Sequence, residues 1–264
     1  MVHELLQSTD ENFVCFLLEQ YVYLKIVANN VGLTTEPKET NSSIIEELTG
    51  SIRSLIVRSS NHGFMFGYAY ELFELIPRIS QFSHRRVTTS PRHNDDELLR
   101  GFMAFELQIL EWKPDPQCPL ISAHISKELD DLARTAGQLY QHALLVFLRI
   151  ALHGPGIPTP HLMMQIGHSI DESLQLIRNL PLDSTVWTTL LWAVLTIGSC
   201  MTEAEDQQFL ISALHNQQHE MHGCTRVLTV LQWVWENCKR DEKFYGPYGI
   251  DRVLTLYNVK LSFA

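Results

Sequence analysis

The sequence of 264 residues lacks most of the local patterns that indicate a chemical activity. It has no Cys-x-x-Cys pair, no glycine-rich phosphate-binding loop, and no basic N-terminal stretch before an apolar run. Its five cysteines are an odd number and lie far apart, and several lie in apolar helical surroundings, as buried reduced thiols do. We therefore expect an intracellular protein without disulfides. The cysteines are Cys15, Cys118, Cys200, Cys224 and Cys238.

Positive charge is scarce as well. Lys and Arg number 20 against 30 Asp and Glu, which gives a formal net charge of −10. Non-specific affinity for nucleic acid comes from Lys and Arg side chains that neutralise phosphates. The charge balance therefore argues against DNA binding by this chain alone.

One stretch of the chain is apolar on nearly every side. It runs from Val186 to Met201 and is interrupted only by threonines, a glycine and a serine. A helix that is hydrophobic all round belongs inside a protein or in a membrane, and this stretch is too short and too polar to span ~30 Å of hydrocarbon. We predict a buried central helix, with Gly198 and Ser199 letting another backbone come close near its end.

A second helix is expected to follow and to fold back on the first. It begins at about Glu203, with Thr202 as a candidate N-cap, and Glu203 and Glu205 place negative charge in a first turn that favours it. Its apolar face holds Phe209, Leu210, Ala213 and Leu214. This hairpin is the predicted centre of the fold.

Apolar residues recur at helical spacing through most of the remaining chain, and no segment shows a strand-turn-strand pattern or a solenoid repeat. Pro77 should kink or split the helix that contains it, and Gly246 to Gly249 is predicted to be a turn before an extended tail. The sequence predicts an all-α fold, a single domain of about nine packed helices around the central hydrophobic hairpin. The helices expected outside the hairpin cover residues 11–29, 43–58, 65–85, 95–112, 121–153, 161–180 and 223–238.

The segment HNQQHEMHGC brings together four potential zinc ligands, namely His215, His219, His222 and Cys224. Two histidines four residues apart on one helix face can chelate zinc. The spacing is not His-Glu-x-x-His, however, and Gly223 is expected to end the helix. We interpret the run as solvated surface at a polar helix end and predict no structural zinc.

Two acidic runs invite comparison with the aspartate-rich helices of terpene synthases, which are also all-α. They are Asp95-Asp96-Glu97 and Asp130-Asp131, and neither continues into the required third acid or is accompanied by a paired magnesium motif. The plainer interpretation of the first run is a helix start that favours negative charge. The second run is then a solvated helix face.

Gly167-His168-Ser169 looks like a nucleophile elbow, but it lacks the second glycine and a preceding strand. The residues therefore predict no catalytic, cofactor-binding or metal site. A stand-alone all-α enzyme or small-molecule carrier, terpene-synthase-like or metal-dependent, is the alternative to a non-enzymatic domain.

The central hairpin carries a further signal. Leu190 to Ala193, then Thr196 to Cys200, then Glu203 to Asp206 resemble a signature of the fungal-specific transcription factor domain. That domain is the helical regulatory region found C-terminal to the six-cysteine binuclear zinc cluster. Family members typically carry Leu-Trp-Pro, then Ala-Gly-Cys, then an acidic stretch that ends in Asp-Arg. This chain departs at Ala193, at Gly198-Ser199 and at Gln207.

Other blocks resemble the family in the same order along the chain. They are the early aromatic helix at Phe16 to Ala28, the Gly-x-x-x-Glu-Leu helix at Gly67 to Ile79, the Tyr-x-x-Ala stretch at Leu139 to Ile150 and the Val-Trp ending at Val230 to Trp235. The resemblance is strongest over residues 13–240, and one regulatory domain is expected over residues 1–264.

The resemblance implies a nuclear regulator of transcription that acts through protein partners of the transcription machinery, a homodimer mate or a small hydrophobic ligand. In the family, bases are read by the zinc cluster, which needs six closely spaced cysteines, and no such array occurs here. We expect either a fragment or shortened gene product, or a protein that works without its own DNA-binding module. DNA is then reached only indirectly or through a missing zinc cluster, and no membrane contact is expected.

Overall fold

The computed structural model describes residues 11–34, 69–88, 95–113, 127–181, 184, 186–216 and 222–261. Within these ranges every regular element is a helix, and nine are α-helices, which confirms the predicted all-α, single-domain fold. The helix predicted over residues 43–58 lies outside the described residues. The α-helices are α2 (Glu11–Asn29), α4 (Tyr70–Thr88), α5 (Asp95–Glu111), α6 (Lys127–His153), α7 (Pro160–Arg178), α8 (Trp187–Gly198), α9 (Ala204–His215), α10 (His222–Cys238) and α11 (Gly246–Leu256).

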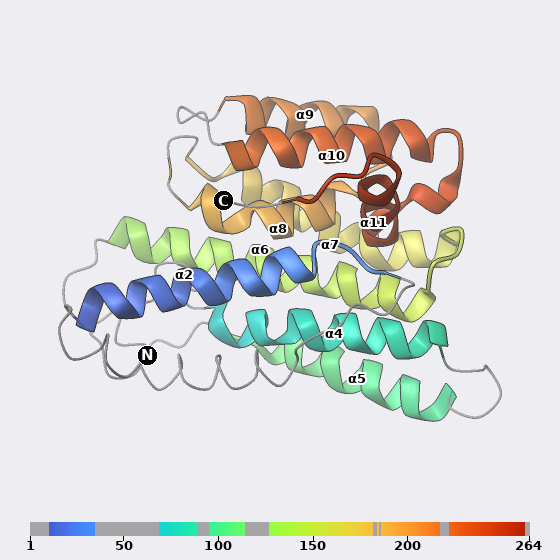
Figure 1. Cartoon of the computed structure of the whole chain (residues 1–264), viewed down its shortest axis with the longest axis horizontal. Helices are drawn as coiled ribbons and strands as arrows, with labels where there is room; N and C mark the ends of the chain where they lie inside the picture. Colours follow the sequence, from blue (N-terminus) through green and yellow to red (C-terminus); the bar gives the residue numbers. More distant parts are fainter. Residues whose placement is uncertain are drawn as a thin grey trace.

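The helices are stacked so that α8 lies in the interior (Figure 1). α9 and α10 form one edge of the molecule, α5 forms the opposite edge, and α8 and α6 lie between them. α6 has 27 residues and is therefore ~40 Å long, so it runs across the molecule and packs against α4, α5, α7 and α8. On its other side α8 packs against α10 and α11.

α8 is buried almost completely, as its sequence predicts. Of its 12 residues, 11 are buried, and Thr188 alone is half-exposed. The close approach expected at its end is made in two ways. A Cβ on Gly198 would lie 2.8 Å from Leu210 of α9 and 3.0 Å from Leu231 of α10, so side chains fill that space. The backbone contact falls one residue later, where the Gly246 amide donates to the Ser199 carbonyl at 3.0 Å.

The start of α9 corrects the predicted N-cap. The N-cap is Glu203, not Thr202, because Glu203 has extended backbone angles (φ −76°, ψ 130°) and its carbonyl accepts the Gln207 amide at 3.1 Å. The Glu203 side chain makes no capping hydrogen bond. Glu205 and Asp206 supply the acidic first turn, where negative charge is favourable.

Pro77 does not split its helix. α4 continues from Tyr70 to Thr88, and Pro77 lies on its buried face. Proline removes one hydrogen bond from a helix, but the apolar residues on both sides of Pro77 pack into the core and stabilise the continuous helix. These residues are Leu72, Phe73, Leu75, Ile76, Ile79 and Phe82.

The prediction of a turn at Gly246 to Gly249 is wrong, because Gly246–Leu256 is a helix, α11. The tail predicted from Val253 to Phe263 begins inside this helix, and residues 257–261 follow it without a helix or a strand. Pro247 stands in its first turn, where a missing amide hydrogen is harmless. The glycines are required by close packing: Gly246 has φ 67°, and a Cβ on Gly249 would lie 1.7 Å from the Phe244 carbonyl oxygen. The turn-like composition therefore reflects how tightly the helix start is packed.

Candidate functional site

The first turn of α8 accepts hydrogen bonds from two buried tyrosines that belong to different helices. Tyr23 of α2 donates to the Thr188 carbonyl at 3.3 Å and to the Thr189 carbonyl at 3.1 Å. Tyr140 of α6 also donates to the Thr189 carbonyl. Phe73 of α4 contacts both tyrosine rings, with centroid distances of 5.8 Å to Tyr23 and 4.3 Å to Tyr140. Three helices are thereby joined to the start of α8.

Trp192 extends these contacts by one turn of α8. Its ring stacks on Tyr140 at 5.9 Å, meets Phe147 edge-on at 5.3 Å, and its indole nitrogen donates to the Asn30 carbonyl at 2.7 Å. The side chain is fully buried and contacts α6 and the residue that follows α2, as expected for the predicted buried central helix. We refer to Tyr23, Phe73, Tyr140, Phe147 and Trp192 as the aromatic cluster.

The other end of α8 is fixed by α10 and by the start of α11. The Trp235 indole nitrogen donates to the Gly198 carbonyl at 2.8 Å, and the Ser199 hydroxyl donates to the Thr196 carbonyl at 2.7 Å. The Cys200 thiol contacts the same carbonyl at 3.6 Å. Both ends of α8 are therefore connected to helices from distant parts of the chain.

Burial shifts the titration of two tyrosines and two thiols in the described part of the chain. Burial raises the pKa of Tyr23 and Tyr140, raises the pKa of Cys200 to about 12, and raises that of Cys224 to about 11. A general base or a nucleophile needs a pKa near or below the working pH. These surroundings therefore favour the protonated form of each group, which disfavours a role as a general base or a nucleophile.

The four residues considered as zinc ligands do not share one environment. His215 is exposed in the last turn of α9, His222 is exposed at the start of α10, and Cys224 is buried. His219 lies outside the described residues. Among the residues that the structure describes, no three His, Cys, Asp or Glu side chains gather in a way that could hold a metal ion.

The two acidic runs lie on separate helices. Asp95-Asp96-Glu97 forms the first turn of α5, where the side chains of Asp96 and Glu97 are exposed. Asp130 pairs with Arg134 at 3.4 Å on the surface of α6, and Asp131 is exposed beside it. Their positions match the interpretation as a helix start and a solvated face.

Gly167-His168-Ser169 lies in the middle of α7 and forms no strand-to-helix turn. His168 is exposed, whereas Ser169 is buried and uses its carbonyl to accept the Ser173 hydroxyl at 2.6 Å. The geometry of a nucleophile elbow is therefore not present at this motif.

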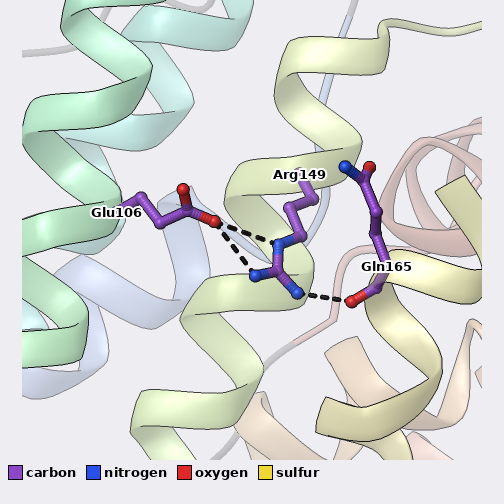
Figure 2. Close-up of polar contacts among 3 residues, drawn as sticks. All are labelled: Glu106, Arg149 and Gln165. Atoms are coloured by element: carbon purple, nitrogen blue, oxygen red, sulfur yellow. Dashed lines mark hydrogen bonds and ion pairs between the residues drawn. The ribbon is translucent and has the colours of Figure 1, made fainter.

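A polar contact between three helices could not be found from the sequence. Figure 2 shows Arg149 of α6 between Glu106 of α5 and the carbonyl of Gln165 of α7. Nε and Nη2 of Arg149 donate to Oε1 of Glu106 at 3.3 Å and 3.0 Å, and Nη1 donates to the Gln165 carbonyl. The side chains of Arg149 and Glu106 are only 20% and 26% exposed, so one guanidinium joins three helices in a largely enclosed place.

A pair of histidines lies between α6 and α7. The rings of His142 and His168 meet edge-to-face at 6.5 Å, and Glu172 lies 4.0 Å from His168. Burial lowers the pKa of His142, the charge of Glu172 opposes that effect, and His168 adds to it. The surroundings of His142 therefore favour its neutral form.

The comparison with known families agrees with the sequence signature in the hairpin. The model of the fungal specific transcription factor domain matches residues 3–251. The chain belongs to this family. The match includes the aromatic cluster, the Arg149 contact and α8 with both of its ends, so the family resemblance predicted from the hairpin is confirmed. No curated protein and no solved structure matches the chain significantly.

Membership of this family supports a role in the regulation of transcription, and the family is not an enzyme family. Of the helices that the structure describes, none is both long enough and apolar enough to cross a membrane. The aromatic cluster and the contacts at the two ends of α8 lie within the matched residues.

Proposed function

We propose that residues 1–264 form the regulatory domain of a fungal zinc-cluster-type transcription factor. The family match over residues 3–251 is the observation that carries this proposal. The domain modulates transcription in the nucleus through protein partners, a second copy of itself or a small ligand. DNA reading belongs to a six-cysteine zinc module, which these 264 residues do not contain.

The charge of the chain supports the assignment of DNA reading to a separate zinc module. A formal net charge of −10 gives phosphate groups little to bind, because affinity for DNA comes mainly from counterions released by Lys and Arg contacts. α8 is buried almost completely, so partners would meet the domain at its surface and not at this helix.

A tethering experiment tests the proposal. The chain is fused to an unrelated DNA-binding module in a fungal reporter strain, and reporter output is compared with that of the module alone. We expect a change in output, either activation or repression, that is lost in Trp192→Ala because the fold is lost and kept in Glu203→Gln. A fusion that is stably expressed and folded but leaves both an activation and a repression reporter unchanged would contradict the proposal.

A further inference from the structure

α5 exposes a stripe of large apolar side chains on the side that faces away from the core. The spacings of four, four and three residues place them on one face of the helix. The opposite face carries Phe102, Phe105 and Ile109, which pack inward. The exposed residues are Leu99 (50% exposed), Met103 (59%), Leu107 (56%) and Leu110 (54%). We call them the α5 stripe.

The α5 stripe lies at the edge of the molecule on a helix that is anchored to the core. α5 packs against α4 and α6 and lies at the far side from α9 and α10 (Figure 1). The ion pair between Glu106 and Arg149 fixes it to α6 and, through the Gln165 carbonyl, to α7 (Figure 2). Single exposed apolar residues are ordinary, but a contiguous row of them marks an interaction site.

The stripe is complementary to itself when two copies of α5 run antiparallel. Its centre falls between Met103 and Leu107, so a two-fold axis there places Leu99 opposite Leu110 and Met103 opposite Leu107. Each large side chain then meets a large side chain of the other copy. This is the symmetry of an isologous contact, in which the same patch serves both partners.

The charges around the stripe match the same arrangement. Asp96 lies at the start of α5 and Lys113 lies two residues beyond its end, and both are exposed. In the antiparallel pair these opposite charges meet twice, and Arg100 lies near Glu111 of the other copy. In a parallel pair the acidic starts of the two helices, with Asp96 and Glu97, would face each other and repel.

We propose that the α5 stripe is a self-association surface, on which α5 of a second copy of this chain packs antiparallel across a two-fold axis. Four side chains on one helix supply less than the ~800 Å² per partner of a standard stable interface, so the dimer is weak, with a Kd of ~1–100 µM. The inference names one partner among those that the proposed function leaves open. It depends only on association measurements, so it can fail while the proposed function holds.

Sedimentation velocity over ~1–200 µM protein at ~0.15 M salt tests the proposal. We expect the unaltered chain to shift from monomer to dimer with rising concentration, and Leu107→Glu to weaken the dimer at least tenfold. Leu256→Glu on α11 is the matched control, because Leu256 is 58% exposed and Leu107 is 56% exposed. It should leave the dimer unchanged.

Charge reversal tests the antiparallel register. Asp96→Lys alone and Lys113→Asp alone each place like charges opposite each other twice, and each should weaken the dimer several-fold. The double variant restores opposite charges and should recover the affinity of the unaltered chain. A mere effect on folding would not be rescued in this way.

Two results would overturn the proposal. One is an unaltered chain that stays monomeric up to ~200 µM, which would mean that the stripe serves another partner or another segment. The other is a dimer that Leu107→Glu leaves intact, or whose single charge variants are not rescued by the double variant, because the contact would then lie elsewhere or run in another register.

Discussion

α8 and α5 are both rich in large apolar residues, but they lie in opposite surroundings. α8 packs against α6 on one side and against α10 and α11 on the other. It also accepts a hydrogen bond from Tyr23 of α2, and its Trp192 donates one to the carbonyl of Asn30, which follows α2. Among the residues that the structure describes, α5 packs against α4 and α6 on one side, and its outer face carries four exposed apolar side chains. Apolar surface stabilises a fold only where it is covered. We therefore assign stability to α8 and recognition to α5.

The largest effect is expected at the centre of α8. Trp192→Ala removes a fully buried ring that contacts Tyr140 and Phe147, and the cavity should lower the free energy of unfolding by ~3–5 kcal/mol. Against a total of ~5–15 kcal/mol, much of the protein should be unfolded or insoluble. Soluble yield and the urea midpoint measure this loss.

Glu203→Gln is the control for the tryptophan variant. Glu203 is exposed at the N-cap of α9 and makes no capping hydrogen bond through its side chain, so the free energy of unfolding should fall by less than ~1 kcal/mol. If Trp192→Ala were as stable as Glu203→Gln, α8 would be peripheral and the architecture described above would be wrong.

The contact that joins the outer layer to the core should have an intermediate effect. Arg149→Ala breaks the ion pair with Glu106 in a place that is largely enclosed, and we expect a loss of ~1–2 kcal/mol in the free energy of unfolding. Arg134→Ala removes a pair with Asp130 whose arginine is 55% exposed, and it should cost less than ~0.5 kcal/mol. Urea denaturation measures the loss in the free energy of unfolding for both variants. Equal losses would mean that the Arg149 contact stabilises the fold no more than an exposed ion pair does.

A smaller effect is expected from pH at the junction of α6 and α7. Burial lowers the pKa of His142 in the folded state, so the unfolded state binds more protons as the pH falls through the ordinary histidine pKa of ~6.5. The free energy of unfolding should therefore decrease between pH 7.5 and pH 5.5. His142→Gln should show a smaller decrease than the unaltered chain.

The control for this pH effect is His215→Gln, which changes an exposed histidine at the end of α9. It should follow the pH dependence of the unaltered chain. Denaturation midpoints at the two pH values give the comparison. An unchanged pH dependence in His142→Gln would mean that His142 does not cause the loss of stability at low pH.

The smallest effect is expected from metal removal. A structural zinc ion at His215, His219, His222 and Cys224 would stabilise the fold, and chelation would then unfold the domain. The described members of this group are divided between exposed and buried positions. We expect EDTA to leave the Tm of metal-analysed protein unchanged, whereas stoichiometric zinc with a large drop in Tm would contradict this.

The strongest features of the fold could be predicted from the sequence because they depend on local composition. The run around Trp192 is apolar on every side, and that alone requires a buried helix. α11 could not be predicted in the same way, because Gly246, Pro247 and Gly249 are typical of turns. Their helical conformation depends on contacts with Ser199 and Phe244, which only the folded chain brings together.

The polar contacts of the candidate site show the same limit. Arg149 and Glu106 are 43 residues apart, and the Tyr23 hydroxyl and its acceptor at Thr189 are 166 residues apart. No spacing rule joins such pairs. The α5 stripe differs, since its side chains recur at helical spacing, but the sequence cannot say which of the two apolar faces of α5 is covered.

Hydrogen exchange of the native protein tests the contrast between α8 and α5 most directly. Amides that open only by global unfolding exchange slowest, and those in elements with few neighbours exchange by local opening. Peptides from Trp187–Gly198 should be protected by the full free energy of unfolding, and peptides from Asp95–Glu111 should exchange at least tenfold faster at a protein concentration where the chain is monomeric. Equal protection of the two helices, or slower exchange in α5, would contradict the account.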